Sequence, residues 1–359
     1  AKHQFGKVSS WINTIVFLIF LAAGGLGWIE SVAMGAADGP ITRGLVFFGV
    51  LALLSVLFNL PFDYYRVFVI EEAHGFNRQT LGGFISDRVK GIVVGVILGG
   101  LILSLILWIM GSMGDLWWVY AWVAMSGFSI ITAWLYPTLL APLFNKFRPI
   151  EEGDLKSKIY ELAQKVGFET DGIFVMDASK RSSHGNAYFT GIAGKKRIVL
   201  FDTLVQAMSP SQVVAVLAHE LGHFKLKHVR WQLVRSIAMT GIMFFLLSLC
   251  LPLESFYLAF NLSGVTNYGA LIVFALWFGV VDFAMQPLEN YISRKNEFSA
   301  DDFARSTLGD ANELSTALLR LREKSHVMPL SHPVFSGFYH SHPPLVERLQ
   351  ALGYRPSGS

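Results

Sequence analysis

The chain has 359 residues, of which 53% are hydrophobic and only 15% are charged. Soluble globular proteins carry about 25% charged residues, so this composition excludes an ordinary soluble domain and favours a multi-spanning membrane protein. The single cysteine, Cys250, excludes an internal disulfide framework and a cysteine-based zinc site. The net charge of +3 is small, so the positions of the charges along the chain are more informative.

A helix needs about 20 apolar residues to cross a bilayer. Six stretches of the chain are long and apolar enough, and each is predicted to form one membrane-spanning helix. They are residues 11–29, 44–60, 91–113, 117–136, 236–258 and 268–286.

The polar segments between these spans differ sharply in their content of Lys and Arg. Of the 29 Lys and Arg residues, 28 lie in four segments, and only Arg43 lies elsewhere. The four segments are residues 1–10, 61–90, 137–235 and 287–359. Since Lys and Arg accumulate in cytoplasmic segments, this asymmetry places both termini and the large polar segments in the cytoplasm.

Residues 137–235 are predicted to contain a small folded domain. Apolar residues at helical spacing predict a helix within residues 151–167, and "DGIFVMD" is predicted to form a strand. "NAYFTGIAGKKRIVLFD" is typical of two strands around a turn at Gly194, Lys195 and Lys196.

A second helix in this segment has a strong start signal. Ser209 is the predicted N-cap, Pro210 occupies the first helical position, and Gln212 stands three residues after the cap. This helix is predicted to continue without interruption into the fifth span.

The same helix carries the H-E-x-x-H pattern at His219, Glu220 and His223. Residues i and i+4 share one helix face, so the two imidazoles can reach one metal ion. Glu220 stands beside them, placed to take a proton from a metal-bound water, as in zinc peptidases. The alternative is a solvated helix face with two unrelated histidines, and the rarity of the pattern argues against it.

A catalytic zinc needs three protein ligands and one open position. His228 is predicted to be a surface residue, because on one continuous helix it would lie about 180° from His219. The third ligand must therefore come from elsewhere, and Glu297 and Asp301 follow the last span, four residues apart. Their spacing suits a metal ligand and a carboxylate that bonds a zinc-bound histidine, although such a pair alone is typical of a solvated helix face.

Several motifs together resemble the CAAX prenyl protease family, the zinc-dependent membrane type. They are "HELGHFKLKH", "SRKNEFSADDFA" and "SHPPLVERL", with further matches in "LPFDYYRVFVIEEAHGFNRQT" and "RSSHGNAYFTGIAGKKRIVLFDTL". The resemblance covers nearly the whole chain and keeps the motifs in order. The family has one more span than is predicted here, and the resemblance places that span before residue 1.

The resemblance implies one zinc ion per chain, bound by His219, His223 and Glu297, with Glu220 as the general base. It implies that Asp301 orients a zinc-binding histidine.

The resemblance also assigns roles toward the substrate. His342 and Arg348 would stabilise the oxyanion of the tetrahedral intermediate, and Asn186 would lie on an edge strand that pairs with the peptide substrate. The implied fold is a multi-pass α-helical membrane protein, a helical barrel around an intramembrane chamber, with a cytoplasmic gluzincin-like α+β zinc protease domain.

The predicted organisation has four parts. Residues 1–136 hold transmembrane helices with the cytoplasmic loop 61–90, residues 137–235 form the catalytic segment, residues 236–286 form a transmembrane helix pair, and residues 287–359 complete the zinc site. The short outer loops and compact length favour a bacterial chain. The predicted location is a bacterial inner membrane, or the endoplasmic reticulum membrane for a eukaryotic chain.

The leading functional prediction is a membrane zinc endopeptidase that cleaves prenylated CAAX-type proteins near the C-terminus and releases the last three residues. The predicted partners are a peptide or protein substrate, with or without a prenyl group, and membrane lipid, with no nucleic acid. One alternative is a broad-specificity quality-control metalloprotease of the same superfamily. An alternative from another class is a non-catalytic transporter or scaffold that retains a dead site.

Overall fold

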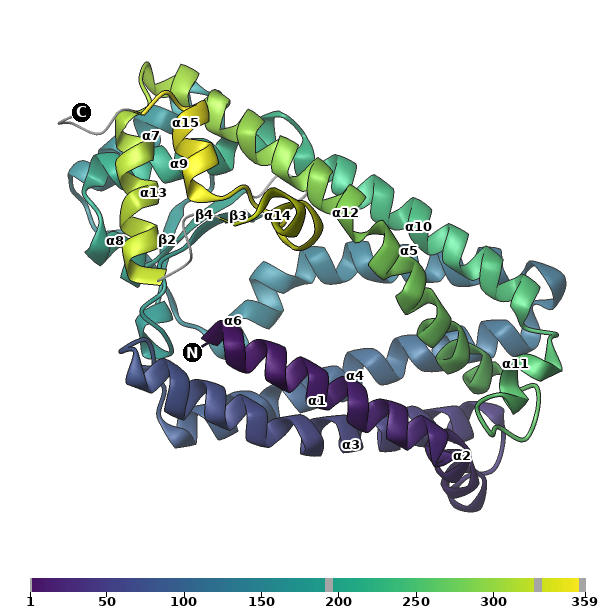
Figure 1. Ribbon diagram of the computed structural model, residues 1–359. Coiled ribbons are helices and arrows are strands. Elements are labelled where there is room, and N and C mark those ends of the chain that lie inside the picture. Colours follow the sequence, from purple (N-terminus) through teal and green to yellow (C-terminus); the bar gives the residue numbers. More distant parts are fainter. Residues whose placement is uncertain (1, 191–195, 326–330, 355–359) are drawn as a thin grey trace. The chain divides into compact units, whose positions relative to one another are not determined.

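The computed structural model describes residues 2–190, 196–325 and 331–354 (Figure 1). The chain divides into two compact units, and each is described by itself. The helical unit comprises Ala1–Asn77, Leu81–Thr132 and Arg235–Val281, and the mixed unit comprises Arg78–Thr80, Ala133–Val234 and Asp282–Ser359.

Long apolar helices build the helical unit. The longer ones are α1 (Lys2–Ala22), α2 (Gly25–Ala36), α3 (Pro40–Tyr65), α4 (Leu81–Ser112), α5 (Trp117–Leu135), α10 (His228–Cys250) and α12 (Asn267–Leu308). The shorter elements are η1 (Arg66–Glu71), η2 (Gly114–Leu116) and α11 (Glu254–Leu258).

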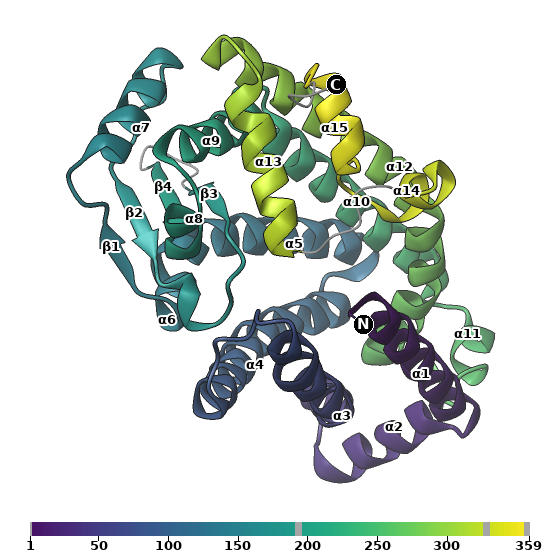
Figure 2. The ribbon, with the colours of Figure 1, turned by 60° about the vertical axis from the view of Figure 1, so that its left-hand side comes forward.

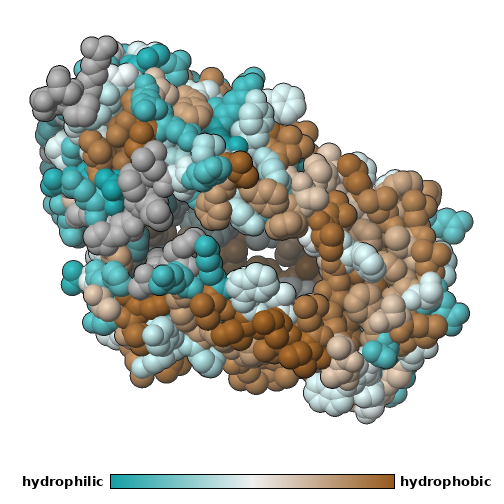
Figure 3. Space-filling model, in the orientation of Figure 1, coloured by the Kyte–Doolittle hydropathy of each residue, from teal (hydrophilic) through white to brown (hydrophobic). Residues whose placement is uncertain are grey.

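Among the described residues, six helical segments are long and apolar enough to cross a membrane, which agrees with the six predicted spans. The face of the helical unit seen in Figure 3 is largely hydrophobic. On α4, for example, the side chain of Val96 is 68% exposed and that of Leu101 is 64% exposed. So much exposed apolar surface is unfavourable in water and favourable against lipid, so the chain is a multi-pass membrane protein.

The first predicted span, residues 11–29, is wrong as a single helix. The chain turns at Gly24, whose φ of 76° is readily adopted only by glycine, and α2 then begins at Gly25. The carboxylate of Glu30 on α2 is buried and accepts hydrogen bonds from the backbone N–H of Ser263 and the hydroxyl of Tyr268. Ser263, before α12, and Tyr268, in the first turn of α12, therefore help to hold α2 in place after the turn.

A four-stranded sheet forms the centre of the mixed unit. Its strands are β1 (Phe147–Pro149), β2 (Ile173–Met176), β3 (Ala187–Thr190) and β4 (Arg197–Phe201), in the order β1-β2-β4-β3. β2 and β4 are parallel, and the other two pairs are antiparallel. The three strands predicted from sequence are confirmed, whereas Gly194 and Lys195 of the predicted turn lie outside the described residues.

The mixed unit also contains helices. They are η3 (Tyr136–Leu140), α6 (Ala141–Phe144), α7 (Asp154–Lys165), η4 (Ala178–Lys180), α8 (Asp202–Ala207), α9 (Pro210–Lys225), α13 (Asn312–Ser325), α14 (Pro333–Tyr339) and α15 (Leu345–Ala351). α9 packs against α7, α13 and β3 (Figure 2). Its residues from Val213 to His219 are all buried in the core of the unit, so its position is firmly set.

The start of α9 follows the sequence prediction. Ser209 caps the helix by accepting from the backbone N–H of Gln212, whose side chain accepts from the backbone N–H of Ser209. Its end does not follow the prediction. α9 stops at Lys225, Lys227 has a φ of 61°, and α10 begins at His228, so the predicted continuous helix is wrong.

Candidate metal centre

Three side chains from two helices converge on one point in the mixed unit. His219 and His223 lie one turn apart on α9, and Glu297 lies on α12, whose helix continues well past the predicted end of the last span. The ligand atoms of the three residues all lie within 4.8 Å of one another. The structure thus brings together the three residues predicted to bind the metal.

The spacing of these atoms fits a zinc ion. The two Nε2 atoms are 3.3 Å apart, and the Glu297 oxygens lie 3.5 Å from Nε2 of His219 and 3.3 Å from Nε2 of His223. In a tetrahedral site with metal–ligand bonds near 2.0–2.1 Å, ligand atoms are about 3.3–3.4 Å apart. Oε2 of Glu297 is buried without a hydrogen-bond partner. Buried polar atoms usually have a partner, so this oxygen fits the role of a metal ligand.

A carboxylate behind His219 fixes the orientation of its ring. Oδ1 of Asp301, one turn after Glu297 on α12, lies 2.8 Å from Nδ1 of His219. Burial alone would lower the pKa of His219, but the adjacent carboxylates of Asp301 and Glu297 raise that pKa to about 9. Without a metal the site therefore favours a positive charge at this position, which is the electrostatic condition for holding a cation.

Arg348, on α15, is paired mainly with Asp301. Its Nε and Nη2 donate to the two carboxylate oxygens at 2.8 and 2.6 Å, a bidentate pair, and its Nη1 lies 3.5 Å from Oε2 of Glu297. The guanidinium is largely buried, and the nearby carboxylates raise its pKa further although burial opposes this. Two of its three nitrogens are therefore committed to holding Asp301.

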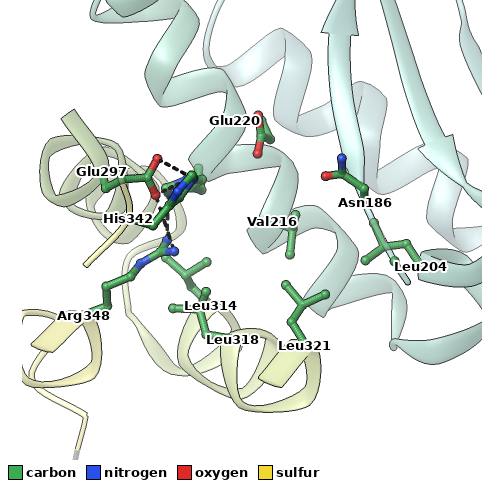
Figure 4. A pocket seen from close by; sticks show the side chains of 12 residues that line it. Asn186, Leu204, Val216, Glu220, Glu297, Leu314, Leu318, Leu321, His342 and Arg348 are labelled. Carbon is green, nitrogen blue, oxygen red and sulfur yellow. Dashed lines mark hydrogen bonds and ion pairs between the residues drawn. The ribbon is translucent and has the colours of Figure 1, made fainter. Parts of the chain in front are cut away.

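Glu220 and His342 line a cavity of about 150 Å³ next to the ligands (Figure 4). Burial raises the pKa of Glu220 above the ordinary value of a glutamate. The His342 side chain is 67% exposed, with Nε2 3.5 Å from Oε1 of Glu297. A carboxylate and an imidazole thus face the same space as the predicted metal ligands.

The edge of the sheet lies on another side of this cavity. Asn186 immediately precedes β3, and its carbonyl accepts from the backbone N–H of Phe201, which extends the β3–β4 ladder by one residue. Its exposed side chain lines the cavity (Figure 4). Among the described residues no further strand pairs with the outer side of β3, so its backbone groups can pair with an extended peptide.

His228 is not the surface residue that the sequence predicts. It is half-buried, and its Nδ1 lies 3.0 Å from Nδ1 of His223. Its Nε2 lies 3.4 Å from Oγ of Ser299 on α12. The break at Lys227 turns His228 back toward the ligands, and since Lys227 is not a glycine, no sequence signal indicated that break.

Gly222 lets α9 and α12, the two helices that carry the predicted metal ligands, approach closely. A Cβ at this position would lie 3.0 Å from Cα and 3.1 Å from the carbonyl oxygen of Ala300 on α12. The contact is with backbone, so it cannot be relieved by a side-chain rotation. Gly222 therefore helps to set the distance from Glu297 to the two histidines.

Family models match the chain along most of its length. Residues 1–146 match the model described as CAAX prenyl protease N-terminal, five membrane helices, and residues 149–356 match that of peptidase family M48. The chain belongs to peptidase family M48, in its CAAX prenyl protease group. The resemblance deduced from the motifs is confirmed.

Relatives of this M48 chain agree with the assignment. It is 38% identical to the human CAAX prenyl protease 1 homolog, over 88% of this chain and 75% of that protein. It is 39% identical to the Arabidopsis thaliana CAAX prenyl protease 1 homolog, over 98% of this chain and 84% of that protein. The crystal structure of S. mikatae Ste24p superposes with a TM-score of 0.92 at 36% identity, covering 98% of this chain and 86% of that one. The M48 chain is therefore a membrane-embedded metalloendopeptidase.

Proposed function

We propose that the chain is a zinc-dependent endopeptidase that cleaves prenylated CAAX-type proteins near their C-terminus, on the cytoplasmic side of the membrane. The observation that carries this proposal is the cluster of His219, His223 and Glu297 with Glu220 at the adjoining cavity. The names of the relatives supply the substrate class. The concentration of Lys and Arg in the polar segments supports the cytoplasmic side.

Glu220 is the proton acceptor of the reaction. A zinc ion held by the three ligands would supply Lewis-acid chemistry, polarising water and the scissile carbonyl. Glu220 takes the proton of the attacking water and delivers it to the leaving amine. Its burial strengthens it as a base, because a raised pKa makes the carboxylate hold a proton more tightly once it has accepted one.

His342 and Arg348 have different tasks in this proposal. His342 is exposed at the cavity and donates from its ring to the developing oxyanion. Arg348 acts first through Asp301, because its two hydrogen bonds fix the carboxylate that orients His219. Only its Nη1 remains to face the reacting carbonyl.

The β3 edge positions the substrate. A peptide that adds as a strand is held by backbone hydrogen bonds, which are independent of its side chains, and Asn186 supplies an amide at the start of that edge. The scissile bond is thereby brought over Glu220 and the metal ligands in an extended form.

Peptide cleavage by the full chain in detergent tests the proposal. A farnesylated CAAX peptide should be cut, the cut should release the last three residues, and a chelator should abolish it. An unprenylated peptide of the same sequence and an unfolded membrane protein serve as comparison substrates. Cleavage of the unfolded protein in preference to the farnesylated peptide would instead establish a quality-control protease.

A further inference from the structure

A second cavity adjoins the one at the metal centre. Its volume is about 230 Å³, and it shares the lining residues Gly185, Leu204 and Leu321 with the first cavity. The two cavities therefore adjoin, and together they are called the groove below. His219 and Glu297 line only the first cavity, and Arg320 lines only the second.

Arg320 is held at this groove by a hydrogen bond, but among the described residues it forms no ion pair. It lies on α13, and its Nε donates to the carbonyl oxygen of Ala207 at 3.1 Å. The residue is exposed, and among the described residues no carboxylate pairs with it. Among the residues that the structure describes, no Asp or Glu lines the second cavity. A guanidinium in this state has N–H groups free to bind a carboxylate in a bidentate manner.

The chemistry along the groove matches the chemistry of the tail that the proposed reaction releases. Beyond Glu220, the first cavity has an apolar wall that includes Val216, Leu314 and Leu318. The second cavity continues with apolar residues and ends in the guanidinium of Arg320. The released tail of a CAAX protein likewise has two aliphatic residues, then a last residue that carries the free C-terminal carboxylate.

We propose that Arg320 binds the C-terminal carboxylate of the substrate and so selects a cut that releases three residues. Three extended residues span at most about 10 Å, which limits how far from the scissile bond the carboxylate of the released tail can lie. This inference rests on the proposed function, because it requires a substrate that ends a few residues after the scissile bond. It adds a recognition site for the substrate's C-terminus.

Two farnesylated CAAX peptides that differ only at the C-terminus test this inference. One carries the free carboxylate and the other the C-terminal amide, and kcat/KM is measured for each with the full chain in detergent. We expect the wild-type chain to prefer the acid by about tenfold, since an exposed but bidentate charge-assisted pair is worth about that factor. Arg320→Gln should reduce the preference to about one, mainly by slowing cleavage of the acid, and Arg320→Lys should retain part of it.

The control is Arg305→Gln, which removes another exposed positive charge of the mixed unit. Arg305 pairs with Asp302 and lines neither cavity. This variant should keep the full preference for the acid. The inference is overturned if the wild-type chain cleaves both peptides equally well, or if Arg320→Gln slows both by the same factor, which would mean a structural role. In either case the farnesylated peptides are still cut, so the proposed function stands; a wild-type chain that cuts neither peptide would refute both.

Discussion

Asp301 on α12 lies 2.8 Å from Nδ1 of His219 on α9, and the guanidinium of Arg348 holds both oxygens of that carboxylate. The pair joins the helix that carries two predicted metal ligands to the helix that carries the third. It fixes the ring of His219 with Nε2 turned toward the metal position.

Replacing Asp301 with asparagine should weaken metal binding by about 10- to 100-fold, because an amide no longer stabilises the proton on Nδ1 of His219 as a carboxylate does. Metal affinity can be measured by competition with a chromogenic chelator. Excess zinc should restore most of the peptidase activity of the variant, because the activity is lost through weaker metal binding. An unchanged affinity would show that Asp301 does not orient the ligand.

Replacing Gly222 with alanine should separate α9 from α12, because the added Cβ meets the backbone of Ala300 at 3.0 Å. We expect a loss of about 1–3 kcal/mol in stability and a lower metal affinity, since the position of Glu297 relative to the histidines changes. Thermal unfolding in detergent and zinc titration measure the two effects. Gly95→Ala is the matched control, because a Cβ at Gly95 has nothing within 4 Å.

His228 is predicted to position His223. With Nε2 of His223 turned to the metal, its Nδ1 carries the proton and donates to Nδ1 of His228, 3.0 Å away. His228→Ala should therefore lower metal affinity by about tenfold. His332→Ala, which removes the histidine that caps α14, should have no such effect. Equal affinities for the two variants would assign His228 a packing role only.

His342→Ala should lower kcat by about a hundredfold with little change in metal content, as expected when one oxyanion donor is removed. Its ring is exposed at the cavity, so the folded structure should tolerate the change. The measurement is steady-state cleavage beside metal analysis of the same sample. A loss of zinc equal to the loss of activity would make His342 a contributor to metal binding.

The local chemistry of the site could be predicted from sequence, because it depends on short spacings. His219, Glu220 and His223 are fixed by helical periodicity, and the cap at Ser209 fixes where their helix begins. Glu297 and Asp301 could be proposed because they too are one turn apart on one helix. Their roles remain predictions that the experiments above test.

The remaining features depend on long-range packing or on unusual backbone conformations. The break after α9 depends on Lys227 in a left-handed conformation that a lysine rarely adopts, and it brings His228 to His223. The pairing of Arg348 with Asp301 joins residues 47 apart in the chain, which no local pattern encodes. The helix that follows the turn at Gly24 is also held by distant contacts, those of Glu30 with Ser263 and Tyr268.

The most direct test of the account compares wild type with Glu220→Gln for both zinc content and cleavage of a farnesylated CAAX peptide. Glu220 lines the cavity beside the ligands but is not one of them. The account predicts one zinc per chain in both proteins and a loss of about a thousandfold or more in kcat for the variant, because the general base is gone. Full activity in Glu220→Gln, with zinc retained, would contradict it.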